Sequence, residues 1–523
     1  MVYRSKLRDV EIPKIGLIHY LFSNKDNIRG DKPVLVDTLD TSRYLTYSLL
    51  EDSILRFGAR LQDVCGFQND DVLALFSSDR YDYSVPFFGA IASGGATTTA
   101  NAKIIVCQED NIEIALDAGA RAGIEKKNIF TFGESQVKNI WPFKTALIRD
   151  REVILAELSF EQTKEKVAVL CFLSGTTGKS KGVMTTHSNL TANVAQYIAF
   201  VGKFMNADTD CILAVVPVFH IFGLMVALNL SLYLGITSYM LPRFDIVDFC
   251  KAVQNHKITY VPVAPPVCLA LARNDAVSHY DLSSLKVLTS GGGPLSNSLS
   301  REVMARIPNA AARQGYGLTE TSPVATAEHL DSVIGGPIGM LFPNMFAKLT
   351  DEDGKKVAQG ESEELCLKGP NLMKGYVNNR VATAECIDNE GYFHTGDTAV
   401  VDENELFSIV DRKKELIKYK GFQVPPTELL TFPGIADCAV IGIYDENRVT
   451  ELPRAYISLK KNIEPSEETA KAIMKFVSDR VVYYKRVRSV RFIDNIPRNS
   501  AGKIQRRELR DAAKLDEAFT SKL

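Results

Sequence analysis

The chain has 523 residues, of which 46% are hydrophobic and 24% are charged, and its formal net charge is −2. These values are ordinary for a globular protein of more than one domain, and the near-neutral charge gives no reason to expect a nucleic acid or an anionic membrane as partner. The nine cysteines include no Cys-x-x-Cys pair, so we expect reduced, buried thiols and neither a disulfide framework nor a zinc site.

Short apolar runs alternate with helical patterns along most of the chain, which predicts an α/β fold with largely parallel sheets. The predicted buried strands are Val72–Phe76, Ile104–Cys107, Val167–Leu173, Cys211–Val216, Ile258–Val263 and Leu285–Thr289. The stretch 211–242 contains no Asp, Glu, Lys or Arg and is long enough to cross a bilayer. Because Pro217 and His220 interrupt it, we expect a buried strand and a core helix over 222–234, and no transmembrane segment.

A loop rich in small and basic residues follows the predicted strand Val167–Leu173. It reads Ser174-Gly-Thr-Thr-Gly-Lys-Ser-Lys-Gly182, and an amphipathic pattern typical of a helix follows it. Glycines let backbone N–H groups approach an anion closely, and the two lysines add positive charge. Only two residues separate Gly175 from Gly178-Lys179, whereas a P-loop needs four. The loop therefore predicts a phosphate-binding turn that is not a P-loop.

Further glycine-containing or histidine-containing motifs follow predicted strands or lie near the end of the chain. They are Pro217–Gly223, Ser290–Pro294, Gly315–Glu320, Tyr392–Asp397 and Pro497–Lys503. Each combines small residues with a hydroxyl, carboxylate, imidazole or ammonium group, which is the composition of a polar ligand site.

The composition of the chain changes after about residue 410, where a strongly charged stretch precedes Gly421. Short strand and helix patterns then suffice for a small α+β domain, so we expect a large multi-sheet domain over 1–410 and a small one over 411–523. The final residues, Ser521-Lys522-Leu523, match a peroxisomal import signal. They predict a peroxisomal location and binding to the import receptor.

Together the motifs resemble the adenylate-forming superfamily of acyl-CoA synthetases, 4-coumarate–CoA ligases, beetle luciferases and peptide-synthetase adenylation domains. The resemblance extends from about residue 40 to residue 510 and is strongest to the 4-coumarate–CoA ligase and luciferase branch. It implies that ATP and a carboxylic acid give an acyl-adenylate and pyrophosphate, and that coenzyme A then displaces AMP. We therefore expect an AMP-forming acid–thiol ligase that uses ATP, Mg²⁺ and coenzyme A.

The resemblance assigns most residues of the nucleotide site motif by motif. Those expected at the triphosphate are Ser174, Gly175, Thr176, Thr177, Gly178, Lys181 and Thr319, and those expected around adenosine are Gly291, Gly292, Gly293, Pro294, Gly315, Tyr316, Asp397 and Arg412. Thr177 and Glu320 are the implied ligands of Mg²⁺, a cation that prefers oxygen.

The resemblance also implies a mobile lid that serves the two reactions in turn. During adenylation, Lys503 would pair the substrate carboxylate with the α-phosphate, and His220 would lie near the same groups. The lid would then rotate about Lys414. The residues expected on the thioester-forming face are Lys418 and Gln423, with Gly421 and Phe422 along the tunnel of coenzyme A.

The residues that match the acyl pocket of relatives are Phe222, Val226, Gly315, Pro323 and Val324. They are mainly apolar, which favours an aryl, arylpropenoic or medium-chain fatty acid over a polar amino acid. Two segments, near residues 97–103 and 427–433, are shorter than the family pattern. These departures keep open a degenerate nucleotide-binding protein with weak or no turnover, and the shared motifs keep open a luciferase-like oxygenase.

Overall fold

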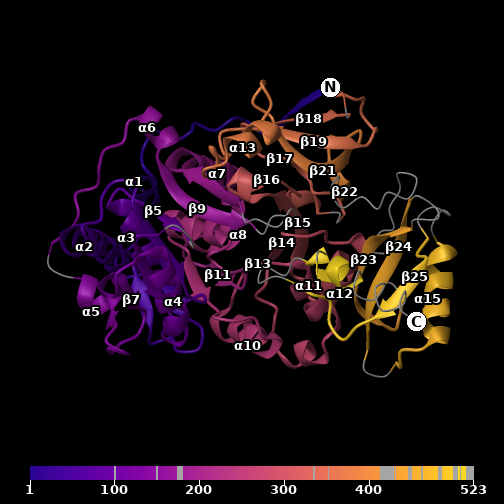
Figure 1. Cartoon of the computed structure of the whole chain (residues 1–523), viewed down its shortest axis with the longest axis horizontal. Coiled ribbons are helices and arrows are strands. Elements are labelled where there is room, and N and C mark those ends of the chain that lie inside the picture. Colours follow the sequence, from indigo (N-terminus) through magenta and orange to yellow (C-terminus); the bar gives the residue numbers. More distant parts are fainter. Residues whose placement is uncertain are drawn as a thin grey trace. The chain divides into compact units, whose positions relative to one another are not determined.

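The structure is a computed structural model, shown along the chain in Figure 1. It describes residues 1–98, 102–148, 151–173, 181–333, 336–351, 353–412, 429, 432–445, 450–460, 463–480, 486–498, 504–506 and 508–513. The chain divides into two compact units, of which the first comprises residues 1–348, 366–394 and 404–407 and the second comprises residues 349–365, 395–403 and 408–523. The division expected at residue 411 stays a prediction.

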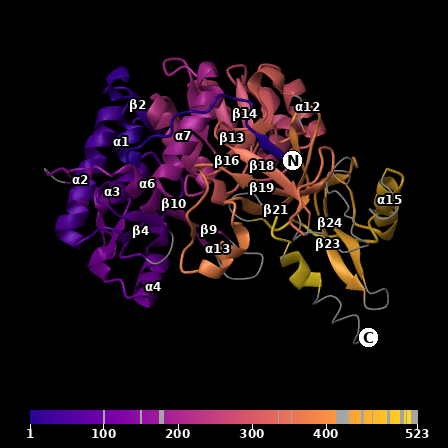
Figure 2. The ribbon, with the colours of Figure 1, turned by 90° about the horizontal axis from the view of Figure 1, so that it is seen from above.

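The first unit contains an eight-stranded sheet whose middle strands run parallel. Its strand order is β20 (Gly375–Tyr376), β10 (Lys181–Thr186), β9 (Val167–Leu173), β5 (Ala96–Thr98), β4 (Val72–Phe76), β6 (Ile104–Cys107), β7 (Ile129–Thr131) and β8 (Trp141–Pro142). The helices that accompany it in sequence are α2 (Tyr47–Cys65), α3 (Ser84–Ala92), α4 (Ile112–Ala122), α5 (Phe143–Leu147), α6 (Phe160–Glu165) and α7 (His187–Val201). Helices α2 and α3 lie side by side, as Figures 1 and 2 show.

A nine-stranded sheet, also in the first unit, carries most of the later motifs. Its order is β17 (Met340–Leu341), β16 (Val324–Ala327), β15 (Ala311–Gly317), β14 (Val287–Ser290), β13 (Tyr260–Val263), β11 (Cys211–Ala214), β12 (Thr237–Met240), β2 (Pro33–Asp37) and β3 (Tyr44–Thr46). The strands from β2 to β15 pair in parallel, as alternating strands and helices require. Helices α10 (Ile246–His256), α11 (Pro265–Arg273) and α12 (Asn297–Arg306) contribute to its apolar core.

Two smaller sheets complete the described fold. A five-stranded sheet has the order β1 (Val2–Arg4), β18 (Phe346–Thr350), β19 (Glu363–Lys368), β21 (Phe393–Val401) and β22 (Phe407–Arg412). The three-stranded sheet lies in the second unit and consists of β23 (Ile435–Asp445), β24 (Thr450–Leu459) and β25 (Ser489–Phe492), with helix α15 (Glu467–Ser478). Ile473 and Val477 of α15 are fully buried in one apolar cluster with strand residues of that sheet.

Most predicted strands are confirmed, but the element predicted to follow the glycine-rich loop is wrong. The loop was expected to join a strand to a helix, but strand β10 lies between loop and helix and pairs antiparallel with β9. Lys181 and Gly182 therefore belong to a strand. Helix α7 begins only after Thr186, whose side chain accepts the Asn189 N–H in a capping box.

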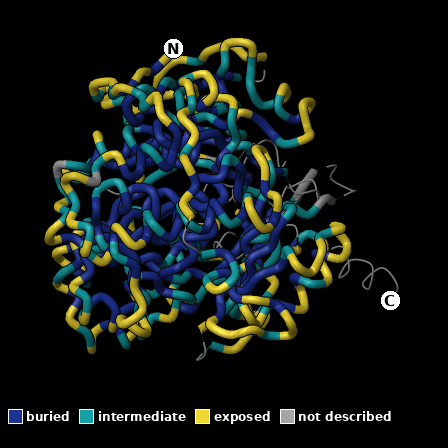
Figure 3. Tube along the Cα trace, turned by 90° about the vertical axis from the view of Figure 1, so that its left-hand side faces the viewer, coloured by how far each residue is buried: buried dark blue, intermediate teal, exposed yellow. Residues whose placement is uncertain are grey.

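The apolar stretch after β11 is helical and buried. It runs without a break through α8 (Ile221–Gly223), the π-helical segment η5 (Leu224–Leu230) and α9 (Ser231–Leu234), with nearly every side chain buried, and Figure 3 marks such buried stretches in dark blue. Within the residues that the structure describes, no helix is both long and apolar enough to span a bilayer.

Candidate active site

The ends of the glycine-rich loop are held together by the hairpin of β9 and β10. Leu173 and Lys181 are paired neighbours in the strand register. The Lys181 ammonium lies 4.8 Å from the centre of the Tyr376 ring, a cation–π contact. The residues predicted to bind phosphate between these two positions, Ser174, Gly175, Thr176, Thr177 and Gly178, lie outside the described residues.

Glu320, the predicted metal ligand, lies in a short helix (η7, Thr319–Thr321) that follows β15. Its side chain and that of Thr319 are buried. The Tyr376 hydroxyl donates a hydrogen bond of 2.8 Å to Glu320 Oε1, and the Met373 N–H donates to the Glu320 carbonyl, also at 2.8 Å. Burial, together with the nearby carboxylate, raises the pKa of Tyr376. The phenol therefore keeps its proton and remains a donor to Glu320.

The residues predicted to surround adenine follow two neighbouring parallel strands. Ser290 of β14 is opposite Gln314 of β15, so Gly291 and Gly315 emerge at the same edge of the sheet. A β-carbon on Gly291 would lie 3.1 Å from the Phe222 ring. Gly292 has a φ of +78°, which favours glycine. The structure therefore brings the predicted nucleotide residues Gly291–Gly293 together with the predicted acyl residue Phe222.

His220 forms the N-terminal cap of α8, and its Nδ1 accepts the Phe222 N–H at 3.3 Å. In the neutral ring the proton therefore resides on Nε2. Gly223 is tightly enclosed, because a β-carbon there would lie 2.3 Å from the Pro217 carbonyl oxygen. This contact explains why the motif needs glycine three residues after the histidine.

A buried carboxylate from another sheet holds the same turn. Asp79, which follows β4, accepts the Val218 N–H at 2.8 Å, and Asp79 is only 5% exposed. Burial raises the pKa of Asp79 to about 7. No local pattern predicts this contact, because Asp79 and Val218 are 139 positions apart in the sequence.

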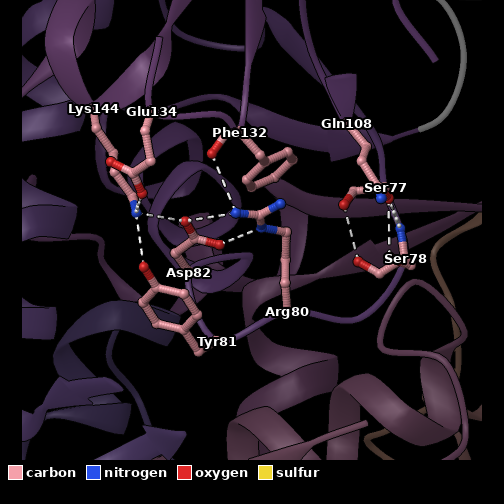
Figure 4. A network of polar contacts seen from close by, with 9 residues as sticks. All are labelled: Ser77, Ser78, Arg80, Tyr81, Asp82, Gln108, Phe132, Glu134 and Lys144. Atoms are coloured by element: carbon pink, nitrogen blue, oxygen red, sulfur yellow. Dashed lines mark hydrogen bonds and ion pairs between the residues drawn. The ribbon is translucent and has the colours of Figure 1, made fainter. Parts of the chain in front are cut away.

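A polar network fixes the turn that carries Asp79 (Figure 4). On one side, the Ser78 hydroxyl donates to Gln108 Oε1 at 2.9 Å. On the other, the buried Asp82 carboxylate is paired with Arg80 and, at 3.0 Å, with Lys144. The Arg80 guanidinium also donates to the Phe132 carbonyl at 3.2 Å. These bonds anchor both flanks of Asp79 to the carboxyl ends of β6 and β7.

Three of the predicted acyl residues, Val226, Pro323 and Val324, lie in two buried segments. Val226 of η5 lines a small cavity of about 10 Å³, and the other residues at this cavity include Tyr197, Tyr260, Thr289 and Arg313. Pro323 and Val324 follow η7, and a β-carbon on Gly317 would lie 1.9 Å from the Pro323 carbonyl oxygen. That collision confines position 317 to glycine.

Two buried asparagines hold the Pro323–Val324 segment in place. Asn193 of α7 donates to the Val324 carbonyl at 2.8 Å and accepts the Val324 N–H at 3.2 Å. Asn371 donates to the carbonyls of Thr321 at 2.7 Å and Val324 at 3.1 Å. Neither residue was predicted from the sequence, because asparagines are mostly solvent-exposed and no local pattern indicates that these two are buried.

Further predicted site residues belong to the second unit. Asp397 is buried in β21, where its N–H bonds the Thr395 hydroxyl at 3.0 Å, after Gly396 with a φ of +71°. Arg412 ends β22. Lys414, Lys418, Gly421, Phe422, Gln423 and Lys503 lie outside the described residues, so their roles stay predictions.

A family model described as AMP-binding enzyme matches residues 22–377, and one described as AMP-binding enzyme C-terminal domain matches residues 427–503. The chain belongs to the AMP-binding enzyme family. This AMP-binding enzyme is similar to 4-coumarate-CoA ligase 1 of Narcissus pseudonarcissus, with 36% identity over 97% of this chain and 96% of the relative. It is also similar to 4-coumarate–CoA ligase 2 of Petroselinum crispum, with 35% identity over 98% of this chain and 96% of that protein.

Solved structures place the AMP-binding enzyme in the same fold. A crystal structure of an ATP-bound RpMatB-BxBclM chimera has a TM-score of 0.84 and 26% identity, covering 95% of this chain and 99% of the other. The anthranilate CoA ligase AuaEII in complex with anthranoyl-AMP has a TM-score of 0.87 and 23% identity, covering 97% of this chain and 99% of the other. The predicted α/β fold with a large multi-sheet domain is thereby confirmed.

Proposed function

We propose that this AMP-binding enzyme is an ATP-dependent acid–CoA ligase. It joins a carboxylic acid to the α-phosphate of ATP with release of pyrophosphate, and then transfers the acyl group from AMP to the thiol of coenzyme A. The similarity to proteins named 4-coumarate–CoA ligases over 97% of the chain carries this proposal.

The described residues suit the adenylation half-reaction. A carboxylate that attacks a phosphate brings like charges together, so cations and hydrogen-bond donors must lie at the phosphates. Lys181 supplies a cation beside the loop, and His220 offers an N–H at Nε2, because its Nδ1 accepts the Phe222 N–H. Glu320 fits a Mg²⁺ ligand by its chemistry, since it is a buried carboxylate. Mg²⁺ bound there supplies charge neutralisation at the phosphates.

The acid is proposed to be an aryl, arylpropenoic or medium-chain fatty acid. Phe222 and Val226 project from one buried helix, while Pro323 and Val324 are also buried. Apolar side chains of this kind bind an aromatic or aliphatic tail better than a charged one. The preferred acid is the one that gives the fastest pyrophosphate release in a panel of acids.

Pyrophosphate release across a panel of acids, with and without coenzyme A, tests the function. We expect release that depends on both ATP and the acid, and an acyl-CoA product when coenzyme A is present. Folded protein that is stabilised by ATP yet releases no pyrophosphate with any acid would favour the degenerate nucleotide-binding alternative. Light emission with luciferin and oxygen would favour the luciferase-like alternative.

Import into peroxisomes is proposed from Ser521-Lys522-Leu523, which lie outside the described residues. The proposed partner is the import receptor that reads this signal. A fluorescent protein fused to the N-terminus should colocalise with a peroxisomal marker, and removal of the three residues should abolish that colocalisation. Equal distributions of the two fusions would contradict import by this signal.

A further inference from the structure

A short segment, residues 373–377, contacts both the end of the glycine-rich loop and Glu320, the predicted metal ligand. In β20 it pairs with β10, with Tyr376 opposite Val183. The Val377 N–H donates to the Gly182 carbonyl at 2.8 Å, and the Met373 N–H donates to the Glu320 carbonyl at 2.8 Å. The main chain of one segment thus spans from the end of the glycine-rich loop to the predicted metal ligand.

Tyr376 uses two different parts of its side chain on two site residues. Its hydroxyl donates to Glu320 Oε1 at 2.8 Å, and its ring lies 4.8 Å from the Lys181 ammonium. The residue is 7% exposed, and its own N–H donates to the Thr383 hydroxyl at 2.9 Å. Burial and a main-chain anchor leave the ring little freedom, so the contacts fix the two charged groups relative to each other.

We infer that Tyr376 is a positioning residue for the phosphate end of the ATP site, holding the Glu320 carboxylate through its hydroxyl and the Lys181 ammonium through its ring. The inference rests on the proposed function, because it takes Lys181 and Glu320 as the groups that meet the phosphates and their metal. A hydrogen bond at one carboxylate oxygen restricts rotation of the carboxyl group, and a ring face attracts an ammonium group.

The two contacts make separable predictions. Loss of the hydroxyl removes its contacts with Glu320 and Cys386 but leaves the ring beside Lys181, so it weakens the contribution of Mg²⁺ to ATP binding. Loss of the whole ring also releases Lys181, so it weakens ATP binding in the absence of metal as well. If Tyr376 merely filled space, its replacement would lower the affinity for ATP equally with and without Mg²⁺, and would lower thermal stability as well.

The test compares Tyr376→Phe, Tyr376→Leu and the wild-type full-length chain by calorimetric titration of ATP, with Mg²⁺ and with EDTA. For Tyr376→Phe we expect affinity for ATP to fall about tenfold with Mg²⁺ and to stay near the wild-type value with EDTA, as for loss of a hydrogen bond to a charged group. For Tyr376→Leu we expect a further loss of about threefold that persists in EDTA.

A matched control is Tyr47→Phe, which removes another buried tyrosine hydroxyl, one that donates to the Leu21 carbonyl at 3.4 Å. It should leave both affinities unchanged. A Tyr376→Phe protein that binds ATP like wild type in both conditions, or loses the same factor in both, overturns the inference while the proposed function stands. Failure of the wild-type chain to bind ATP overturns both. If Tyr376→Leu does not fold, Tyr376→Phe alone decides.

Discussion

Asp79 holds the turn that carries His220 through a hydrogen bond from the Val218 main chain. Val218 is fully buried, so its N–H has no water to replace a lost acceptor. An unpaired buried donor destabilises its local conformation by about 1–3 kcal/mol. The turn that places His220 is therefore sensitive to a residue that never needs to touch substrate.

Replacement of Asp79 tests this sensitivity. Asp79→Ala removes the acceptor and should lower the adenylation kcat about tenfold, corresponding to about 1.4 kcal/mol of lost transition-state stabilisation. Asp79→Asn keeps an acceptor oxygen and should retain most of the activity. Pyrophosphate release under saturating ATP and acid measures the effect. Equal losses in the two variants would contradict a role for the hydrogen bond.

The two lysines of the glycine-rich loop are expected to differ. Lys181 is fixed in β10 with its ammonium over Tyr376, whereas Lys179 lies outside the described residues. Lys181→Ala should therefore raise the KM for ATP about tenfold more than Lys179→Ala does, as expected for the loss of a contact to a charged group. Steady-state kinetics of both variants checks the order, and equal effects would count against the assignment of Lys181.

At the scale of elements, helix α7 presents a row of buried amides to the site. Asn189 donates to the Leu372 carbonyl at 2.7 Å, Asn193 to Val324, and Gln196 to the Pro343 carbonyl at 2.7 Å. Their spacing of four and three residues places them on one helical face. The helix thereby fixes three loops by hydrogen bonds, where an apolar face would only pack against them.

Asn193→Ala should lower the free energy of unfolding by about 2–3 kcal/mol, because it leaves buried main-chain groups of Val324 with fewer partners. It should also raise the KM for the acid more than the KM for ATP, since Val324 is a predicted acyl residue. Urea unfolding and kinetics measure the two effects. The control is Asn309→Ala, at an exposed asparagine that donates to the Ser283 carbonyl. If this variant loses as much unfolding free energy as Asn193→Ala, the prediction for Asn193 is contradicted.

The sequence indicated strands and motifs well, but not the contacts between distant segments. Strands β4, β6 and β9 have the predicted bounds because each is a short, uniformly apolar run. Strand β10 was missed because Lys181-Gly182 begins it with residues typical of loops. Asp79, Asn193 and Tyr376 were missed because their partners are remote in sequence, and no local pattern indicates a long-range hydrogen bond.

At the scale of the whole molecule, burial of ionisable groups links folding to pH. Six of the nine cysteines are buried and three are half-buried, and burial raises the pKa of the Cys268 thiol to about 12. Asp79 has the larger consequence near neutral pH. Its pKa is about 7 in the folded chain and near 3.8 when unperturbed, so the folded state binds a proton that the unfolded state releases.

The stability contribution of this proton is present below about pH 4 and is lost as the pH rises to 7. For one proton, the slope is at most about 1.4 kcal/mol per pH unit. Asp79→Asn lacks the titrating group, so the wild type should lose stability relative to this variant between pH 4 and pH 7, with little further change above. Urea unfolding of both proteins at pH 5, 6, 7 and 8 gives the difference. A constant difference would contradict the raised pKa.

The chain enters and leaves the second unit more than once, and the crossing points lie within strands β18, β19, β21 and β22 or between the last two. The sequence predicted one change, at residue 411, from the strongly charged stretch that precedes Gly421. Segments 349–365 and 395–403 are too short to form a core of their own, so no local pattern assigns them to the second unit.

The pairing of Leu173 with Lys181 has a consequence for insertions and deletions in the loop between them. The hairpin fixes where the seven residues 174–180 begin and end, so a change in their number leaves both anchoring strands in register. Closing a loop of twice the length costs only about 0.6 kcal/mol. Length variants of this loop should thus leave the fold nearly untouched while changing the segment that is predicted to bind phosphate. Nucleotide preference could then change there independently of folding.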